Sequence, residues 1–339
     1  MKKKAIIAIC LLVFVFLILP MTVTIVTYKY HFGSRVSHDN NYFEYITEKN
    51  TSFVKEDVSF QSNEGQILRG GIYTQVENDD PRGFIIFVHG NKLSHEEYLA
   101  EIEWLTLENY VVFSYDNTGT QSSDGDSLKG LTQAVIDLSH ALEYVKGMYD
   151  LPYILIGHSW GGFAVSSVYE YGVSYDVDAI VSLAGFYKNI NIVIDIAKLY
   201  VGDVVQILRP YLEVYEWYLF AENSNLDGID GLKNTTAKVL MIHSEDDHIV
   251  GYNNNFLVYK NAFENDDRFT FISYEDAGHR LTITGEAYDN IHDIMHHQLE
   301  YEAGSERYLE LREERNSMIY EFNEDILADI LDFCNEITE

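Results

Sequence analysis

A serine between two glycines is the first group in the sequence that could carry covalent chemistry. The apolar run Ile154–Ile156 continues into Gly157–Gly161, a G-x-S-x-G motif centred on Ser159, and residues that suit a helix follow. A serine hydroxyl is a weak nucleophile unless it is held exposed beside a general base. A sharp strand-to-helix turn holds it in this way, and such a turn needs glycine where neighbouring backbone comes close. We therefore predict that Ser159 is a nucleophile.

An imidazole is the usual base for such a serine, and His279 is the histidine whose position suits this role. It follows the apolar run Phe269–Tyr274 and is preceded by Gly278, so a flexible loop can deliver it to the edge of a sheet. Its expected task is to take the proton of Ser159 and to pass it to the leaving group. His248 is the nearest alternative among the twelve histidines.

A second turn precedes the serine in the chain and suggests an oxyanion hole. The apolar run Phe84–Val88 ends in His89-Gly90-Asn91. Ligands of open α/β sheets bind at the carboxyl ends of the strands. We therefore expect the backbone N–H of Asn91 to pair with that of Trp160, at the positive end of the helix that follows the serine. His89 precedes the serine, and we expect it to shape the loop rather than to act as the base.

The elements that must position these residues alternate between strand-like and helix-like segments. Val54–Phe60 and Ile67–Thr74 predict a β-hairpin. Short apolar runs of the kind buried on both faces of a parallel sheet follow, at Phe84–Val88, Val111–Tyr115, Tyr153–Ile156, Ala179–Leu183, Val239–Ile242 and Phe269–Ser273. Helical stretches lie between them, most clearly at His95–Glu108, Leu128–Lys146 and Gly162–Tyr171. The sequence therefore predicts an α/β fold with a mostly parallel sheet that helices cover on both sides.

Two segments interrupt the alternation. Residues 186–232 are rich in aromatic side chains and too long for an ordinary loop, so we predict an inserted helical cap. Residues 281–339 are acidic and largely helical in pattern. They end in an amphipathic run that should dock on the sheet, formed by Ile319, Phe322, Ile326, Ile330 and Phe333.

Taken together, the motifs resemble those of the α/β-hydrolase superfamily, most closely the serine hydrolases of the monoglyceride lipase, esterase and serine-aminopeptidase-like group. The resemblance covers residues 53–335, apart from the cap and residues 281–305. It rests on His89-Gly90, Tyr115-Asp116-x-x-Gly119 with Ser122 and Gly125, Gly157–Gly161, Ser244–Asp247 and Ala277-Gly278-His279. It implies the α/β-hydrolase fold and a triad in the order nucleophile, acid, base.

The resemblance also points to the acid of the triad. In this family the acid lies three residues after a small residue, usually glycine, and an apolar pair follows it. Counting from Ser244, which takes the place of that glycine, gives Asp247, with Ile249 and Val250 after it. Asp246 is the alternative. The expected role of Asp247 is to fix the tautomer of His279 and to stabilise the imidazolium.

The first residues suggest a membrane anchor. Lys2, Lys3 and Lys4 precede Ala5–Thr27, an uncharged and mainly apolar stretch. As a helix it would be about 35 Å long at ~1.5 Å per residue, enough to cross a bilayer. The chain has no alanine between Ala8 and Ala100 to form an A-x-A cleavage site, so we favour an uncleaved anchor over a signal peptide that is removed after secretion.

The anchor defines the expected domain organisation and location. The lysines should keep the amino end in the cytoplasm and place the remainder outside the cell membrane. We expect cytoplasmic lysines and anchor in residues 1–27, a polar stalk in 28–52, and the hydrolase domain in 53–339. The two cysteines, Cys10 and Cys334, are not placed to pair, which suits an exported bacterial protein that does not rely on disulfides.

Composition and charge exclude other classes. With 47% hydrophobic residues, global disorder is excluded. A formal charge of −31, from 54 acidic and 23 basic residues, argues against nucleic acid partners. His292 and His296 imitate the spacing of a zinc motif, but no third ligand is evident, so we expect a surface pair and neither metal nor cofactor.

The function that these features favour is hydrolysis of a small-molecule ester, which could be a lipid, with an apolar acyl group. An aminopeptidase or amidase with the same triad is the near alternative. A non-catalytic binding protein on the same fold would normally have lost a triad residue. A haloalkane dehalogenase also has His-Gly-Asn and a tryptophan after the nucleophile, but its nucleophile is an aspartate, whereas this chain has Ser159.

Overall fold

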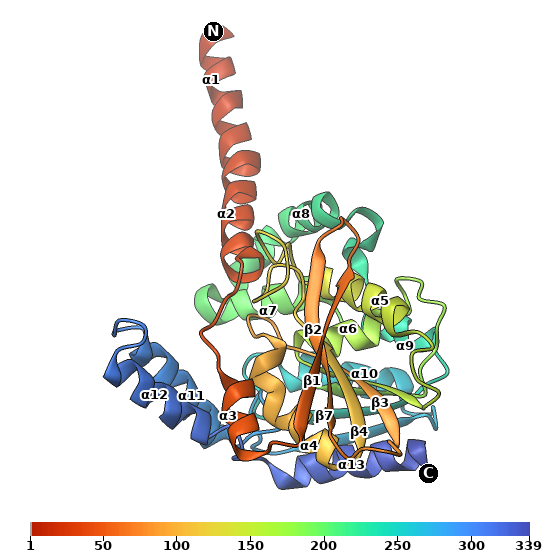
Figure 1. Cartoon of the computed structure of the whole chain (residues 1–339). Coiled ribbons are helices and arrows are strands. Elements are labelled where there is room, and N and C mark those ends of the chain that lie inside the picture. The colour runs from red at the N-terminus through yellow and green to blue at the C-terminus, as the bar shows by residue number, and fades with distance from the viewer. Residues whose placement is uncertain (1) are drawn as a thin grey trace.

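An eight-stranded sheet with the order β1-β2-β4-β3-β5-β6-β7-β8 forms the centre of the protein (Figure 1). The structure is a computed structural model and describes residues 2–339. The strands are β1 (Phe53–Gln61), β2 (Ile67–Gln75), β3 (Gly83–Val88), β4 (Tyr110–Tyr115), β5 (Tyr153–His158), β6 (Ala179–Leu183), β7 (Lys238–Ser244) and β8 (Phe269–Tyr274). The first two strands form the predicted antiparallel hairpin, β2 pairs antiparallel with β4, and all other neighbours are parallel. The predicted mostly parallel sheet is confirmed.

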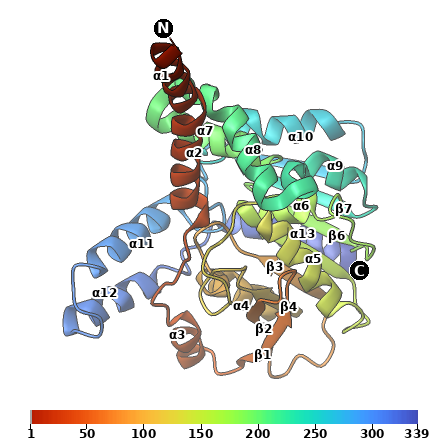
Figure 2. The ribbon, with the colours of Figure 1, turned by 90° about the horizontal axis from the view of Figure 1, so that it is seen from above.

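Helices cover both sides of this sheet (Figures 1 and 2). The helices in the described residues are α1 (Lys2–Val13), α2 (Leu19–Tyr28), α3 (Tyr42–Lys49), α4 (Leu99–Leu107), α5 (Gln133–Val145), α6 (Trp160–Ser167), α7 (Asn189–Val201), α8 (Arg209–Phe220), α9 (Gly228–Lys233), α10 (Phe256–Phe263), α11 (Gly285–Gln298), α12 (Glu306–Ser317) and α13 (Glu324–Thr338). Of these, α1 and α2 form a projecting N-terminal helix, and α11 and α12 form an arm. Two of the helices begin later than the sequence predicts. The turn His95–Tyr98 is a 3₁₀-helix, and α5 begins only at Gln133, because Lys129 and Gly130 have positive φ angles of 63° and 153°.

The parallel strands place the predicted site residues at one edge of the sheet. Val88 at the end of β3 pairs with Gly157 of β5, and His158 at the end of β5 pairs with Leu183 of β6. The loops that follow β3, β5, β7 and β8 therefore leave the sheet at the same edge. This edge is the place where open α/β sheets bind ligands.

Each face of the sheet has its own hydrophobic core. One core joins the sheet to α5, α6, α10 and the cap, and the other joins it to α3, α4 and α13. Every residue of β3, β4, β5 and β6 is buried, as expected for strands covered on both faces. The amphipathic C-terminal run docks as predicted, since Ile326, Ile330 and Phe333 of α13 lie in the second core.

The cap consists of helices, as the sequence predicts, and it lies against the N-terminal helix. It contains α7, α8 and α9 with the 3₁₀ turns Gly202–Leu208 and Ala221–Asn225 between them. Figures 1 and 2 show α7 and α8 beside the lower part of the long helix that contains α1 and α2. Helix α11 and helix α12 form a separate arm, which projects from the body well away from the tip of that long helix.

The N-terminal helix is long and apolar enough to cross a membrane. It runs from Lys3 to Gly33 and contains two π-helical segments, Phe14–Ile18 and Lys29–Gly33. Its most apolar window has a mean hydropathy of 3.1 and is 0% buried within the protein. A signal sequence would have the same properties, so the helix is a candidate anchor.

Residues 28–52 differ from the polar stalk that we expected. Tyr28, Phe32 and Val36 are buried in the first core. Arg35 donates hydrogen bonds to the carbonyl oxygens of Ser123 and Gly125. Helix α3 is likewise packed on the domain. The three apolar residues are separated by mainly polar ones, and the mixed composition of the segment conceals their burial.

A buried hydrogen-bond network joins the base of the N-terminal helix to the cap. The hydroxyl of Tyr28 donates to the Glu216 carboxyl and accepts from the N–H of Leu131 at 3.3 Å. Its ring meets the ring of Tyr215 edge-on, with 5.4 Å between centroids. Asn189 donates to the second Glu216 oxygen at 3.2 Å. Burial raises the pKa of Glu216 from 4.5 to about 7, although the Tyr28 hydrogen bond opposes this rise.

This network predicts a pH-dependent stability. Between about pH 4.5 and 7 the Glu216 carboxyl is ionised in the unfolded chain but protonated in the folded protein, so the folded protein loses stability as the pH rises through this range. Glu216→Gln imitates the protonated carboxyl and removes that loss. We expect the Tm of the variant in detergent to rise relative to wild type between pH 4.5 and 7. A Tm difference that does not change with pH would contradict the protonated Glu216.

Candidate active site

Ser159 lies in a strained turn between β5 and α6. Its φ and ψ angles are 55° and −109°, and its N–H donates to the carbonyl oxygen of Leu183 at 2.8 Å. A Cβ atom on Gly157 would lie 2.3 Å from the carbonyl oxygen of Gly161, and one on Gly161 would lie 2.0 Å from that of Val88. No side chain fits at such distances, so both glycines of the motif are required by the turn.

The structure brings Ser159, His279 and Asp247 together. His279 Nε2 lies 2.9 Å from Ser159 Oγ, and His279 Nδ1 lies 2.7 Å from Asp247 Oδ2. The three side chains come from the turn after β5, the loop after β8 and the turn after β7. A base in contact with both a hydroxyl and a carboxylate is the arrangement that activates a serine.

Comparisons with known proteins agree with this fold. A sequence model of the serine aminopeptidase family S33 matches residues 79–229, which include Ser159 but neither Asp247 nor His279. An esterase from Pyrococcus furiosus has 18% identity and a TM-score of 0.58, over 76% of this chain and 94% of that one. Est1E from Butyrivibrio proteoclasticus, solved with ferulic acid bound, has 15% identity and a TM-score of 0.50, over 72% and 98%. No curated protein matches the sequence.

The chain has the α/β-hydrolase fold, and residues 79–229 are similar to the serine aminopeptidase family S33. The predicted resemblance and the predicted fold class are thereby confirmed. The sequence identities to the solved structures are below 20%, so the similarity shows only the fold. The substrate therefore has to be argued from the site.

The Asp247 carboxylate is held in the ionised form. It is 5% exposed, and its Oδ1 accepts the N–H groups of Ile249 at 2.8 Å and Val250 at 2.9 Å. Burial alone would raise the pKa of Asp247, but the charge and hydrogen bond of His279 outweigh burial and hold that pKa below its ordinary value. An ionised carboxylate at Nδ1 leaves Nε2 of His279 free to accept the Ser159 proton.

The alternatives to Asp247 and His279 lie outside the hydrogen-bonded chain. Asp246 turns the other way, accepts the Ser244 hydroxyl and accepts the N–H of Gly278 at 2.9 Å. It therefore ties the turn after β7 to the loop that carries His279. His248 is exposed to solvent. The geometry thus favours Asp247 over Asp246 and His279 over His248. The catalytic roles of Asp247 and His279 stay predictions.

Asn91 and Trp160 lie where two backbone N–H groups could receive an oxyanion. Trp160 is the first residue of α6, so its N–H has no partner within the helix. Among residues 2–339, no carbonyl oxygen of a turn or loop and no side chain accepts a hydrogen bond from the N–H of Asn91. Gly161 holds the start of α6 against the end of β3, because its α-carbon faces the carbonyl oxygens of Val88 and His89.

His89 shapes this loop, as expected, and is not in contact with Ser159. Its Nδ1 donates to the carbonyl oxygen of Gly90 at 2.8 Å, and its Nε2 accepts the N–H of Asn117 at 3.0 Å. Burial lowers the pKa of His89. A neutral imidazole with one donor and one acceptor fits both bonds.

A second histidine, which the sequence analysis did not single out, supports the backbone of the base. His158 Nε2 donates to the carbonyl oxygen of His279 at 2.9 Å, and His158 Nδ1 lies 2.7 Å from the hydroxyl of Tyr98. Burial, and then the positive charges of nearby side chains, hold the pKa of His158 well below its usual range. The neutral ring therefore keeps this donor-acceptor pattern.

A buried ion pair continues this support. Arg280 donates to Glu101 at 2.8 Å, and its guanidinium lies 3.7 Å from the centroid of the Tyr98 ring. The Thr282 hydroxyl donates to the same Glu101 oxygen at 2.7 Å. The signal in the sequence was the two glutamates, Glu101 and Glu103, among the apolar residues of α4, because burial of a charge is costly unless it is paired.

The remaining polar groups suggest neither a metal nor the substrate site. His292 and His296 are both exposed on α11, and within residues 2–339 no group of three or more His, Cys, Asp or Glu side chains could hold a metal ion.

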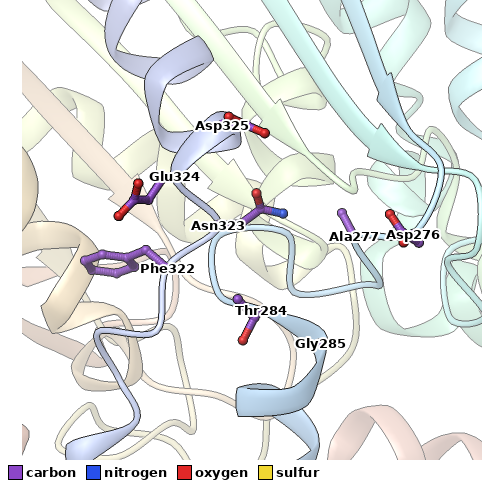
Figure 3. A pocket seen from close by; sticks show the side chains of 8 residues that line it. All are labelled: Asp276, Ala277, Thr284, Gly285, Phe322, Asn323, Glu324 and Asp325. Carbon is purple, nitrogen blue, oxygen red and sulfur yellow. The ribbon is translucent and has the colours of Figure 1, made fainter.

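A pocket beside the His279 loop contains none of the predicted site residues (Figure 3). Its lining is Asp276, Ala277, Thr284, Gly285, Phe322, Asn323, Glu324 and Asp325.

The two neighbouring aspartates give a matched test of the site. Asp247→Asn removes the carboxylate that orients His279, so we expect kcat to fall by roughly 10³- to 10⁴-fold. Asp246→Asn keeps an acceptor oxygen for Gly278 and should change kcat only slightly. The measurement is steady-state hydrolysis of a soluble ester by both variants. A reversed order of the two effects would move the acid to Asp246.

Proposed function

We propose that the protein is a serine hydrolase that cleaves carboxylic esters with an apolar acyl group. The observation that carries this proposal is the position of His279, which lies within hydrogen-bond distance of both Ser159 and Asp247. A buried carboxylate with a lowered pKa at one ring nitrogen and a serine in a strained turn at the other are the components of nucleophilic catalysis.

In the first half of the reaction, Ser159 Oγ attacks the carbonyl carbon of the ester while His279 Nε2 takes the hydroxyl proton. The negative charge that develops on the carbonyl oxygen is stabilised by the N–H groups of Asn91 and Trp160. His279 then gives its proton to the leaving alcohol, and the acyl group stays on Ser159.

In the second half, water takes the place of the alcohol. His279 Nε2 accepts a proton from the water, whose oxygen attacks the acyl carbon and forms a second oxyanion at the same N–H groups. Collapse of this intermediate releases the carboxylic acid and returns the proton to Ser159. Throughout, the ionised Asp247 stabilises the positive charge on His279.

An aminopeptidase or amidase is the second candidate, because residues 79–229 match the serine aminopeptidase model. The same triad would attack an amide, and the leaving group would be an amine. A non-catalytic binding protein is disfavoured, because this chain keeps all three residues in hydrogen-bonded order. Comparison of acyl esters with aminoacyl amides as substrates distinguishes the first two functions.

We propose further that the N-terminal helix is an uncleaved anchor and that the hydrolase domain lies on the extracellular side of the cell membrane. Three lysines at the amino end favour the cytoplasm for that end. The buried contacts of Tyr28 with Glu216 and Tyr215 support retention of the helix, because the domain and the end of the helix share one core. A secreted form after signal cleavage is the alternative.

The nucleophile is tested by covalent labelling. A fluorophosphonate probe reacts with activated serines, and activation of Ser159 requires the neighbouring His279. We expect the wild-type chain to be labelled, Ser159→Ala to show no labelling, and the exposed control Ser52→Ala to be labelled as wild type. Labelling of Ser159→Ala at the wild-type level would show that another residue is the nucleophile.

A further inference from the structure

Residues 199–220 of the cap expose large apolar side chains to an unusual degree. Tyr200 is 75% exposed, Trp217 64% and Tyr218 77%. Five aliphatic side chains of the same segment are also exposed, namely Leu199, Val201, Val204, Ile207 and Val214. We call residues 199–220 the cap face. Such a patch on a soluble surface marks a site of contact with a partner or a membrane.

The cap face is also poor in free charge, although the chain as a whole carries −31. Its charged residues are Asp203, Arg209, Glu213 and Glu216. Arg209 pairs with Glu213 at 3.2 Å, and Glu216 is buried against Tyr28. This leaves Asp203 alone as an exposed charge without a partner among the described residues, so transfer of the cap face into an apolar medium has a small electrostatic cost.

The cap face lies beside the N-terminal helix and makes a hydrogen bond to its backbone. Pro20 has no N–H, so the carbonyl oxygen of Phe16 four residues earlier lacks its α-helical donor. The Tyr211 hydroxyl of α8 donates to that oxygen. In hydrocarbon, where no water is available, an unpaired carbonyl is costly and is satisfied by a neighbouring protein group. Figures 1 and 2 show α8 near α2, the lower part of the long helix.

Helix geometry places this contact below the membrane surface. Counted from Lys4, a hydrocarbon core of about 30 Å takes up about 20 residues at ~1.5 Å per residue and ends near Thr24. Phe16 lies about 12 Å before that end by the same rise per residue. A hydroxyl bonded to Phe16 must then lie among the acyl chains of the outer leaflet, and the start of α8 must lie close to it.

We propose that the cap face is seated in the outer leaflet of the membrane that the N-terminal helix crosses, with its aromatic and aliphatic side chains among the lipid acyl chains. Interfacial helices bury apolar side chains about 5–10 Å into the headgroup and acyl boundary, and the Tyr211 contact places the start of α8 at least this deep. The exposure of Tyr200, Trp217 and Tyr218 then has a physical reason. This inference rests on the proposed anchor and is independent of the catalytic residues.

Trp217 makes the proposal testable in the full chain. The protein is reconstituted in bilayers of phosphatidylcholine, whose zwitterionic headgroups keep the net charge of −31 out of the result. A fraction of the lipid carries bromine on its acyl chains, which quenches nearby indoles. Of the three tryptophans, Trp160 is buried and Trp104 of α4 is half-buried against the second core, so the exposed Trp217 should supply the quenched emission. We expect strong quenching of wild type and its loss in Trp217→Phe.

Two further variants on the Trp217→Phe background locate the bilayer. Leu17→Trp places an indole on the exposed surface of the N-terminal helix and should restore quenching. Leu299→Trp places one at the tip of the α11–α12 arm, where the native side chain is 81% exposed, and should not be quenched.

The outcomes separate the cap from the anchor. Quenching that needs Trp217 supports the proposal. If Leu17→Trp is quenched while wild type and Trp217→Phe do not differ, the cap face lies outside the acyl chains and the proposal is overturned, while the anchor stands. If Leu17→Trp is not quenched either, the helix does not enter the bilayer and both are overturned.

Discussion

The backbone at Ser159 has a positive φ angle of 55°, which an L-residue adopts only where the surrounding structure compels it. Two features hold this conformation. Gly157 and Gly161 pack closely against neighbouring backbone, and the N–H of Ser159 donates to the carbonyl oxygen of Leu183 in β6. The same contacts bring the end of β3 against the start of α6. This strained turn therefore sets the positions of the proposed nucleophile, Ser159, and of both proposed oxyanion donors.

His279, the proposed base, is fixed from two sides although it lies on a loop. Asp246 accepts the N–H of Gly278, and His158 donates to the carbonyl oxygen of His279. These bonds hold the residues around the imidazole, while Asp247 holds the ring itself. Because catalysis by a triad requires the reacting atoms to be held in near-attack geometry, the fixed backbone matters as much as the three side chains.

Much of the site could be predicted from the sequence because its signals are local. The glycines around Ser159, and the apolar runs that form strands buried on both faces, are visible in single segments. The supporting groups were not predictable in this way. Tyr98, His158 and Glu101 acquire their roles only when strands and loops from distant segments meet at the sheet edge.

The N-terminal segment shows the same limit. The sequence predicts its apolar stretch, but the partners that bury Tyr28 lie in the cap and in the loop before α5, far along the chain. A polar stalk was therefore expected where the structure has a packed junction. The cap face, too, has a pattern that suits packing around a substrate, and only the structure shows that its largest rings point outward.

The most direct test of the central claim, that Ser159 forms the acyl-enzyme, is to trap that intermediate. The full chain is mixed with an activated ester of a medium-length acid, the reaction is stopped with acid during the first turnover, and the digest is analysed by mass spectrometry. The account predicts one acyl group, attached to Ser159. Turnover with no acylated residue, or an acyl group on a different side chain, would contradict it.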